Sequence, residues 1–350
     1  MNARIEEFIR NPEYRKALGL PEAVCEEYVP LAQGEYNVNY LFRHPADGRL
    51  LVLRVNAGSQ MHLDRQIEYE AHALELLRGS GRTPELLYAD GSKRYIDNGV
   101  LVMEYLPGRY PAYDNRSEMN GVMECLADIH SVQIPGDEVV WGEPESVPRD
   151  TVKLIAPADP ATAILDECEA MVRTYMDSPL GSDSVKKRLR TMLDRGHEIA
   201  DNGKDLAEDT YRCCINTELN STNFLADEGT VRLVDWEKPL YGDPAQDLGH
   251  LLAPTTTFWK TDVILDQKET DRLMDEYIKA VRNRFDITGI RERTLRLIKI
   301  TCLRGLTWCA MAWVQYKDPE KEIVNESTRL KLDAYLSDSF LADIEQRLGL

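Results

Sequence analysis

Four polar side chains with the chemistry of a phosphate site interrupt two short apolar segments in the middle of the chain. The first segment reads "CINTELNSTNFL" and carries Asn216, Glu218 and Asn223, and the second begins "VDWE" and carries Asp235. Amide and carboxylate oxygens suit Mg²⁺, which completes its ligand set with water and phosphate oxygens. A further carboxylate can orient an attacking hydroxyl. Together these residue types indicate metal-assisted phosphoryl transfer.

The sequence "NFLADEGTVRLVDW" predicts a β-hairpin that brings two of these residues together. Residues 224–226 form the first strand, residues 227–229 the turn, and residues 231–234 the returning strand, with Gly229 able to take a positive φ. The open ends of an antiparallel hairpin are adjacent, so Asn223 and Asp235 become neighbours. A single Asn or Asp at a strand end is most often a turn cap. The spacing of the whole set favours a metal site, which Glu218 approaches from five residues upstream.

The same segments resemble the aminoglycoside phosphotransferase and choline kinase-like family, whose members share a protein kinase-like fold. The family has a loop of pattern H-G-D-x-x-x-x-N, then I-D-W/F-E, then G-D-P-x-x-D-L; this chain has "NTELNSTN", "VDWE" and "GDPAQDL". The loop departs from the pattern at Asn216, in place of the usual His, and at Glu218, in place of the catalytic Asp. The resemblance implies that Asn223 and Asp235 bind the metal, that Glu218 and Asp235 are catalytic, and that Asp247 is structural.

Less specific motifs extend the resemblance to the first hundred residues. "LAQGEYNVNYLF" places Gly34 in the loop that covers the nucleotide phosphates, and "LVLRV" places Arg54 at the family's basic strand residue. An arginine fork can bind phosphate oxygens, although an exposed Arg on an edge strand is the alternative. The resemblance implies Glu70 as the ion-pair partner of Arg54, with Glu68 as the other choice.

"LVMEYLPG" resembles the segment that links the two lobes of these kinases. Its backbone from Glu104 to Leu106 is expected to hydrogen-bond the adenine edge. His130, in "LADIHSV", is expected to be a packed structural histidine. The segment "TTTFWKTD" around Phe258 is a candidate wall of the acceptor pocket, the part of the family that varies most.

The pattern of apolar residues predicts an α+β chain of two lobes. Residues 35–44, 49–57 and 98–106 read as strands, and residues 62–79 read as a helix capped by Gly79. Helical patterns dominate after the Pro-Gly break that follows Leu106, and the Pro-rich stretch 135–150 reads as a loop. We therefore expect a strand-rich, nucleotide-binding N-lobe at 1–106 and a C-lobe at 107–350 with the catalytic loop, metal site and acceptor pocket.

Composition restricts the function further. Forty-two Lys and Arg against 60 Asp and Glu give a net charge of −18, which opposes nucleic-acid binding. Seven cysteines without a CxxC spacing, and a charged start instead of a signal peptide, favour a reducing cytoplasm. The longest apolar stretch, residues 297–314, contains Lys299 and Arg304, so we expect a buried helix and no membrane span.

The sequence therefore predicts a small-molecule kinase with ATP and Mg²⁺ as cofactors. It transfers the γ-phosphoryl group to a hydroxyl of a small molecule, with ATP expected in the cleft between the lobes. The altered loop at Asn216 and Glu218 leaves one alternative, a nucleotide-binding pseudokinase that acts as a sensor or scaffold. Protein substrates are not expected, because HRD, DFG and APE motifs are missing. The sequence does not distinguish ATP from GTP, identify the acceptor or fix the oligomeric state.

Overall fold

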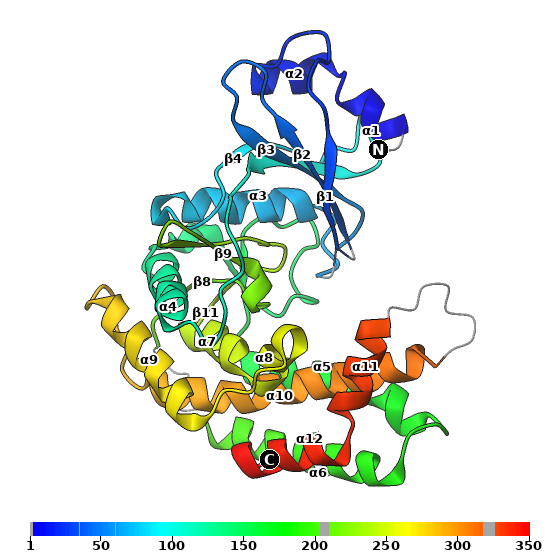
Figure 1. Ribbon diagram of the computed structural model, residues 1–350, viewed down its shortest axis with the longest axis vertical. Coiled ribbons are helices and arrows are strands. Elements are labelled where there is room, and N and C mark those ends of the chain that lie inside the picture. The colour runs from blue at the N-terminus through cyan, green and yellow to red at the C-terminus, as the bar shows by residue number, and fades with distance from the viewer. Residues whose placement is uncertain (1–2, 35, 60, 204–209, 318–325) are drawn as a thin grey trace. The chain divides into compact units, whose positions relative to one another are not determined.

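The chain divides into two compact units. The computed structural model describes residues 3–34, 36–59, 61–203, 210–317 and 326–350. The first unit contains residues 1–156 and 223–241, and the second contains residues 157–222 and 242–350 (Figure 1). The second unit is mostly helical. The hairpin predicted around Asn223 and Asp235 belongs to the first unit, whereas Glu218 belongs to the second.

A five-stranded antiparallel sheet forms the centre of the first unit. Its strand order is β1-β2-β3-β5-β4, with β1 at Val29–Gln33, β2 at Asn37–Arg43, β3 at Leu50–Asn56, β4 at Leu86–Asp90 and β5 at Gly99–Glu104. The three strands predicted from the sequence are confirmed. Because β3 is the central strand, both of its edges are paired, and Arg54 does not lie on a sheet edge.

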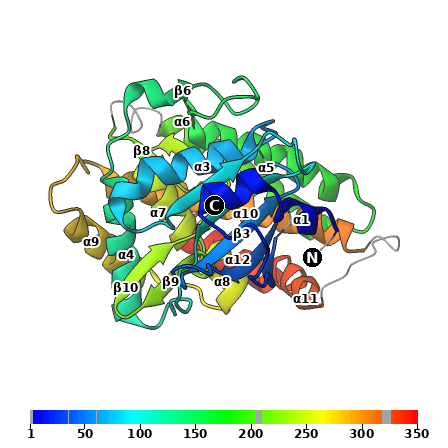
Figure 2. The same ribbon diagram turned by 90° about the horizontal axis from the view of Figure 1, so that it is seen from above.

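Helices cover both faces of this sheet (Figures 1 and 2). The short helices α1 (Ala3–Phe8) and α2 (Pro12–Leu18) pack against the face to which β3 contributes Leu51, Leu53 and Val55. Side chains alternate along a strand, so Val52 and Arg54 point to the opposite face. Helix α3 (Gln66–Leu77) lies there, and its Glu70 contacts Arg54.

The helix end predicted at Gly79 is wrong. Helix α3 ends at Leu77 and is followed by a 3-10 turn over Arg78–Ser80. Gly81 is the residue in the left-handed region, with φ 66°, and its N–H donates to the carbonyl of Arg78. The extra 3-10 turn moves the glycine cap two residues along the chain.

The predicted hairpin is confirmed as β9 (Phe224–Asp227) and β10 (Thr230–Leu233). Asp227 pairs with Thr230, so the turn contains only Glu228 and Gly229, both at positive φ (45° and 83°), as a type I′ turn requires. Helix α4 (Arg116–His130) packs against both strands. Gly108, at φ 144°, runs against the backbone of Ala226, where a Cβ would come within 3.0 Å of the carbonyl oxygen.

The Pro-rich stretch 135–150 is not only a loop. It contains a 3-10 turn at Gly136–Glu138 and the short strand β6 (Val139–Trp141). This strand pairs in parallel with β7 (Leu154–Ala156). Three consecutive apolar residues, Val139, Val140 and Trp141, are too short a run to predict a strand among the surrounding turn residues.

Within the described part of the second unit, eight helices form most of the structure. They are α5 (Pro160–Asp177), α6 (Asp183–Asn202), α7 (Pro244–Leu252), α8 (Pro254–Thr261), α9 (Gln267–Val281), α10 (Ile290–Gln315), α11 (Glu326–Tyr335) and α12 (Asp338–Leu348). Strand β8 (Cys213–Ile215) also lies in this unit, and β11 (Leu240–Gly242) crosses the boundary. Asp159, Asp243 and Asp266 cap three of these helices through their carboxylates.

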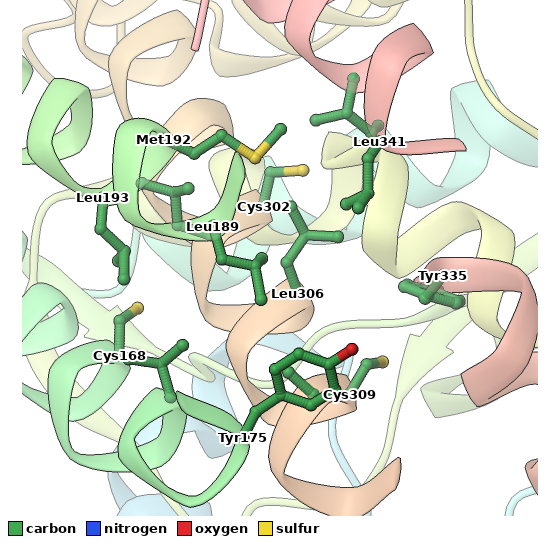
Figure 3. Packing of buried hydrophobic residues seen from close by; sticks show 14 of the residues in the cluster. Cys168, Tyr175, Leu189, Met192, Leu193, Cys302, Leu306, Cys309, Tyr335 and Leu341 are labelled. Atoms are coloured by element: carbon green, nitrogen blue, oxygen red, sulfur yellow. The ribbon is translucent and has the colours of Figure 1, made fainter. Parts of the chain in front are cut away.

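The core of the second unit is built around α10. Leu306 and Cys309 of α10 pack with Cys168 and Tyr175 of α5 and with residues of α6, α11 and α12 (Figure 3). The buried helix predicted at 297–314 is confirmed. By length and composition alone α10 could cross a membrane, but 61% of its most apolar window is buried, as in a core helix. All seven cysteines are free thiols.

Candidate active site

The two ends of the β9–β10 hairpin meet beside the sheet of the first unit. The N–H of Val234 donates to the carbonyl of Asn223 over 2.9 Å, which continues the hairpin pairing up to the two polar residues. Asp235 follows directly and takes φ 67°, a conformation that Asp tolerates better than most residues. The hairpin therefore places one amide side chain and one carboxylate at the same end.

Arg54 joins this hairpin to α3. Its guanidinium is buried and donates to Glu70 Oε1 over 2.5 Å, to Asp235 Oδ1 over 2.9 Å and to Asn39 Oδ1 over 3.2 Å. Glu68, the alternative partner, pairs with Arg65 instead. Burial opposes the charge on Arg54, but the two carboxylates outweigh it and raise the pKa of the guanidinium. Arg54 is therefore a permanent cation.

The two carboxylates beside Arg54 differ in exposure. Glu70 is buried, and burial raises its pKa against the opposing effect of Arg54. The side chain of Asp235 is 41% exposed. Glu70 is thus suited to hold Arg54 in place, while Asp235 is accessible to a ligand.

A second set of contacts runs from the "VDWE" segment to the strands. Glu237 Oε2 accepts from Asn37 Nδ2 over 2.5 Å, and the Glu237 carbonyl accepts from Gln66 Nε2 over 2.6 Å. Asn37 also accepts from Asn56 Nδ2 over 2.9 Å. Gly34 lies in the β1–β2 connection, where its N–H donates to the Asn37 carbonyl over 2.8 Å. The loop assigned to the phosphates is therefore tied to the segment that carries Asp235.

Glu104 and Leu106, assigned to the adenine edge, lie at the end of β5 and just after it. The backbone N–H of Glu104 donates to the carbonyl of Glu85 over 2.9 Å, and that of Tyr105 donates to Leu50 over 3.0 Å. Leu106 is buried. The role of this segment in nucleotide binding stays a prediction.

In the second unit, Asp247 holds the loop that carries Glu218. The Asp247 carboxylate is fully buried and accepts the backbone N–H groups of Asn216 over 2.9 Å and of Thr217 over 2.8 Å. The side chain of Asn216 accepts the N–H of Glu218 over 3.2 Å, which closes a local turn. Thr217 takes φ 71°, a strained conformation for a β-branched residue. Thr217 stands at the glycine of the H-G-D pattern, so the loop departs from that pattern at three positions.

Glu218 lies in a cluster of charged groups within the same unit. Its Oε1 accepts from Arg304 Nη2 over 3.2 Å, and Arg304 also binds Glu167 through Nε (2.7 Å) and Nη2 (3.2 Å). His250 contacts the carbonyl of Leu219 through Nδ1 over 2.6 Å. Burial, followed by the charge of Arg304, lowers the pKa of His250 to about 4. His250 is therefore neutral at pH 7, with the proton on Nδ1.

The sequence interpretation missed Arg304 and Glu167. Arg304 was used only as evidence against a membrane span. Because a charge inside an apolar helix is costly unless it is paired, its position was itself a signal for a buried carboxylate partner. No sequence signal singled out Glu167, which is one of several acidic residues along α5.

The donor set fits a magnesium ion that is held mainly by its nucleotide. Among the described residues there is no group of three or more His, Cys, Asp or Glu that could hold a metal without other ligands. The buried Asn223 brings an amide side chain to this end of the hairpin through its backbone pairing with Val234, and Asp235 brings an accessible carboxylate. This is the small oxygen set that Mg²⁺ takes from a protein when phosphates supply further ligands.

Comparison with known proteins places this geometry in a family. The sequence model of the "Phosphotransferase enzyme family" matches residues 27–291. Similar solved structures include an ethanolamine kinase from Plasmodium vivax, with 14% identity over 94% of this chain and 86% of that chain and a TM-score of 0.58. The ternary complex of streptomycin, ATP and APH(2″)-IIa has 15% identity over 96% of each chain and a TM-score of 0.53.

A third similar structure is the amicoumacin kinase hAmiN in complex with AMP-PNP, Ca²⁺ and Ami. It has 14% identity over 99% of this chain and 96% of that chain, with a TM-score of 0.58. At these identities the structures show the fold, which is protein kinase-like, as the sequence motifs predicted. No curated protein has a significantly similar sequence.

Proposed function

Since the chain belongs to the phosphotransferase enzyme family, we propose that it transfers the γ-phosphoryl group of ATP to a hydroxyl of a small molecule. The observation that carries the proposal is the convergence of Asn223, Asp235 and Arg54 at one end of the hairpin. A buried, permanent cation beside an accessible carboxylate and an amide oxygen is a phosphate-and-metal environment. A structural role alone would not require the accessible carboxylate.

In this proposal Asn223 and Asp235 would hold Mg²⁺, which would neutralise negative charge on the phosphates. Arg54 contributes a guanidinium to the phosphate oxygens, and Glu70 keeps that side chain in place. Glu218 accepts the proton of the acceptor hydroxyl. The acceptor oxygen forms a bond to the γ-phosphorus as the bond between that phosphorus and the β,γ-bridging oxygen breaks, so ADP leaves with the electron pair of the broken bond.

The remaining assignments concern nucleotide binding and context. Gly34 covers the phosphates, and the backbone from Glu104 to Leu106 binds the adenine edge. A cytoplasmic location fits both a supply of ATP and seven free cysteines. The comparisons give no support to the alternative of a pseudokinase, and Glu218, although longer than the usual Asp, keeps a carboxylate in the loop.

The test is an ADP-release screen with purified protein, ATP and Mg²⁺. The acceptor panel contains sugars, aminoglycosides, choline-like amines and amino acids, because the family name does not define the substrate. We expect one class to stimulate ADP release, and the stimulation to disappear in Glu218→Gln. ATP binding without stimulation by any acceptor would favour the pseudokinase.

A further inference from the structure

Arg304 lies within the apolar helix α10 of the second unit and contacts two carboxylates, Glu167 and Glu218, from a largely buried position. Its side chain is only 18% exposed. Burial opposes its charge, but Glu167 and Glu218 outweigh the burial and raise the pKa of the guanidinium. Arg304 is therefore a cation at pH 7.

The three side chains come from three separate elements. Glu167 lies on α5, Arg304 on α10, and Glu218 on the loop after β8. Helices α5 and α10 pack closely against each other (Figure 1). The Nε and Nη2 contacts to Glu167 fix the plane of the guanidinium, and the same Nη2 reaches Glu218. The packing of α5 against α10 thus holds the Arg304 cation in a fixed position beside the Glu218 carboxylate.

We propose that Arg304 is a positioning residue for Glu218. The guanidinium of Arg304, fixed by Glu167, holds the Glu218 carboxylate in one orientation and keeps it ionised. The catalytic meaning of this contact rests on the proposed function, whereas the contact itself does not. The local backbone is fixed independently by Asn216 and Asp247. Arg304 supplies the remaining constraint, on the side chain.

The length of the side chain supports this interpretation. An aspartate at position 218 would be shorter by roughly 1.5 Å, one carbon–carbon bond. The present contact of 3.2 Å would then be lost unless the loop moved. Glutamate at this position and arginine at position 304 therefore form a matched pair. This pairing accounts for glutamate in place of aspartate at position 218, one of the three departures of the loop from the family pattern.

Other charged groups near Glu218 define what a pH measurement reports. His250 on α7 is neutral above about pH 4, and Asp247, also on α7, binds the loop backbone. Glu167 contacts Arg304 from α5. Removing the charge of Arg304 takes away a cation in contact with Glu218 and leaves the carboxylates of Glu167 and Asp247 in the same cluster. Protonation of Glu218 is then favoured.

The experiment follows the ionisation of Glu218 directly, by carboxyl ¹³C NMR of glutamate-labelled protein. The Glu218 signal is identified by its loss in Glu218→Gln. In Arg304→Gln we expect its titration midpoint to rise by about one pH unit. In Arg304→Lys the charge remains, so the midpoint stays close to that of the wild type, while the single ammonium cannot reproduce the fork.

Arg190→Gln is the matched control. Arg190 forms a similar double contact with Glu169, two residues after Glu167 on α5, but it lies on α6 and does not contact Glu218. Its removal should leave the Glu218 midpoint unchanged. An unchanged midpoint in Arg304→Gln, or the same shift in Arg190→Gln, would overturn the proposal.

Once an acceptor is known, the kinetics of Arg304 variants distinguish an effect on the orientation of the Glu218 carboxylate from an effect on its ionisation. We expect kcat to fall about a hundredfold in Arg304→Gln and about tenfold in Arg304→Lys, with KM for ATP unchanged. The acid limb of the pH profile should move upward only in Arg304→Gln. Wild-type kcat and pH profile in Arg304→Gln would overturn the positioning role. Full activity in Glu218→Gln would instead contradict the proposed catalytic base. The NMR titration would still show whether Arg304 keeps Glu218 ionised.

Discussion

His250 is expected to make the stability of the second unit depend on pH, although the position is not part of the proposed chemistry. Its pKa falls from 6.5 in the unfolded chain to about 4 in the fold, because burial and then the charge of Arg304 disfavour the imidazolium. Between these values the unfolded chain binds the proton and the folded chain does not. The stabilisation is therefore complete above about pH 6.5 and is lost as the pH falls toward 4.

The magnitude follows from these two pKa values. Linkage gives a loss of about 0.2 kcal/mol at pH 7 and about 2 kcal/mol at pH 5, both relative to high pH. The variant His250→Asn removes the titration but keeps an amide N–H at the position of Nδ1, which can donate to the Leu219 carbonyl as Nδ1 does over 2.6 Å. The stability difference between wild type and variant should thus change by about 2 kcal/mol in favour of the variant from pH 7 to pH 5.

Urea unfolding followed by tryptophan fluorescence at the two pH values measures this difference. Other titrating groups affect wild type and variant alike, so the comparison isolates His250. Parallel losses of stability in the two proteins between pH 7 and pH 5 would refute the inference that His250 is held neutral beside Arg304.

Three further substitutions test the site. Asp235→Asn keeps a residue that tolerates the left-handed backbone but removes the negative charge that would contact the metal, so kcat should fall by a factor of about 1000 or more. Turnover within about tenfold of wild type would contradict the role of Asp235. Glu218→Asp should lose the contact with Arg304 and slow transfer about a hundredfold; faster turnover would mean that the loop is not adapted to glutamate. Thr217→Gly relieves the strain at φ 71° and should raise the melting temperature by about 1–2 °C, and a lower melting temperature by scanning calorimetry would show that the backbone there is not strained.

Local sequence patterns were sufficient to predict the elements that carry Arg54, Asn223 and Asp235. The strands and the Glu228–Gly229 turn depend on residues that are close together in the sequence. For this reason β2, β3, β5 and the hairpin could be predicted. From the hairpin follows the proximity of Asn223 and Asp235. The cap of α3 was misplaced because two glycines, Gly79 and Gly81, follow the helix, and only backbone geometry separates them.

Contacts between segments that are distant in the sequence could not be predicted from local patterns. The sequence offered Glu68 and Glu70 as partners of Arg54 without a physical reason to choose, and the choice depends on which face of α3 meets β3. The pairing of Glu218 with Arg304 spans 86 residues and depends on the packing of α10. The role of Asn216 is local, but it became visible only when its side chain was seen to accept the N–H of Glu218.

The most direct test of phosphoryl transfer to a hydroxyl is a ³¹P NMR spectrum of the complete reaction with ATP, Mg²⁺ and the acceptor that stimulates ADP release. The proposed function predicts that the γ-phosphate signal of ATP is replaced by the signals of ADP and of a new phosphomonoester on the acceptor, and that Asp235→Asn forms no such product. Formation of inorganic phosphate alone, or an unchanged ATP spectrum with bound nucleotide, would contradict it.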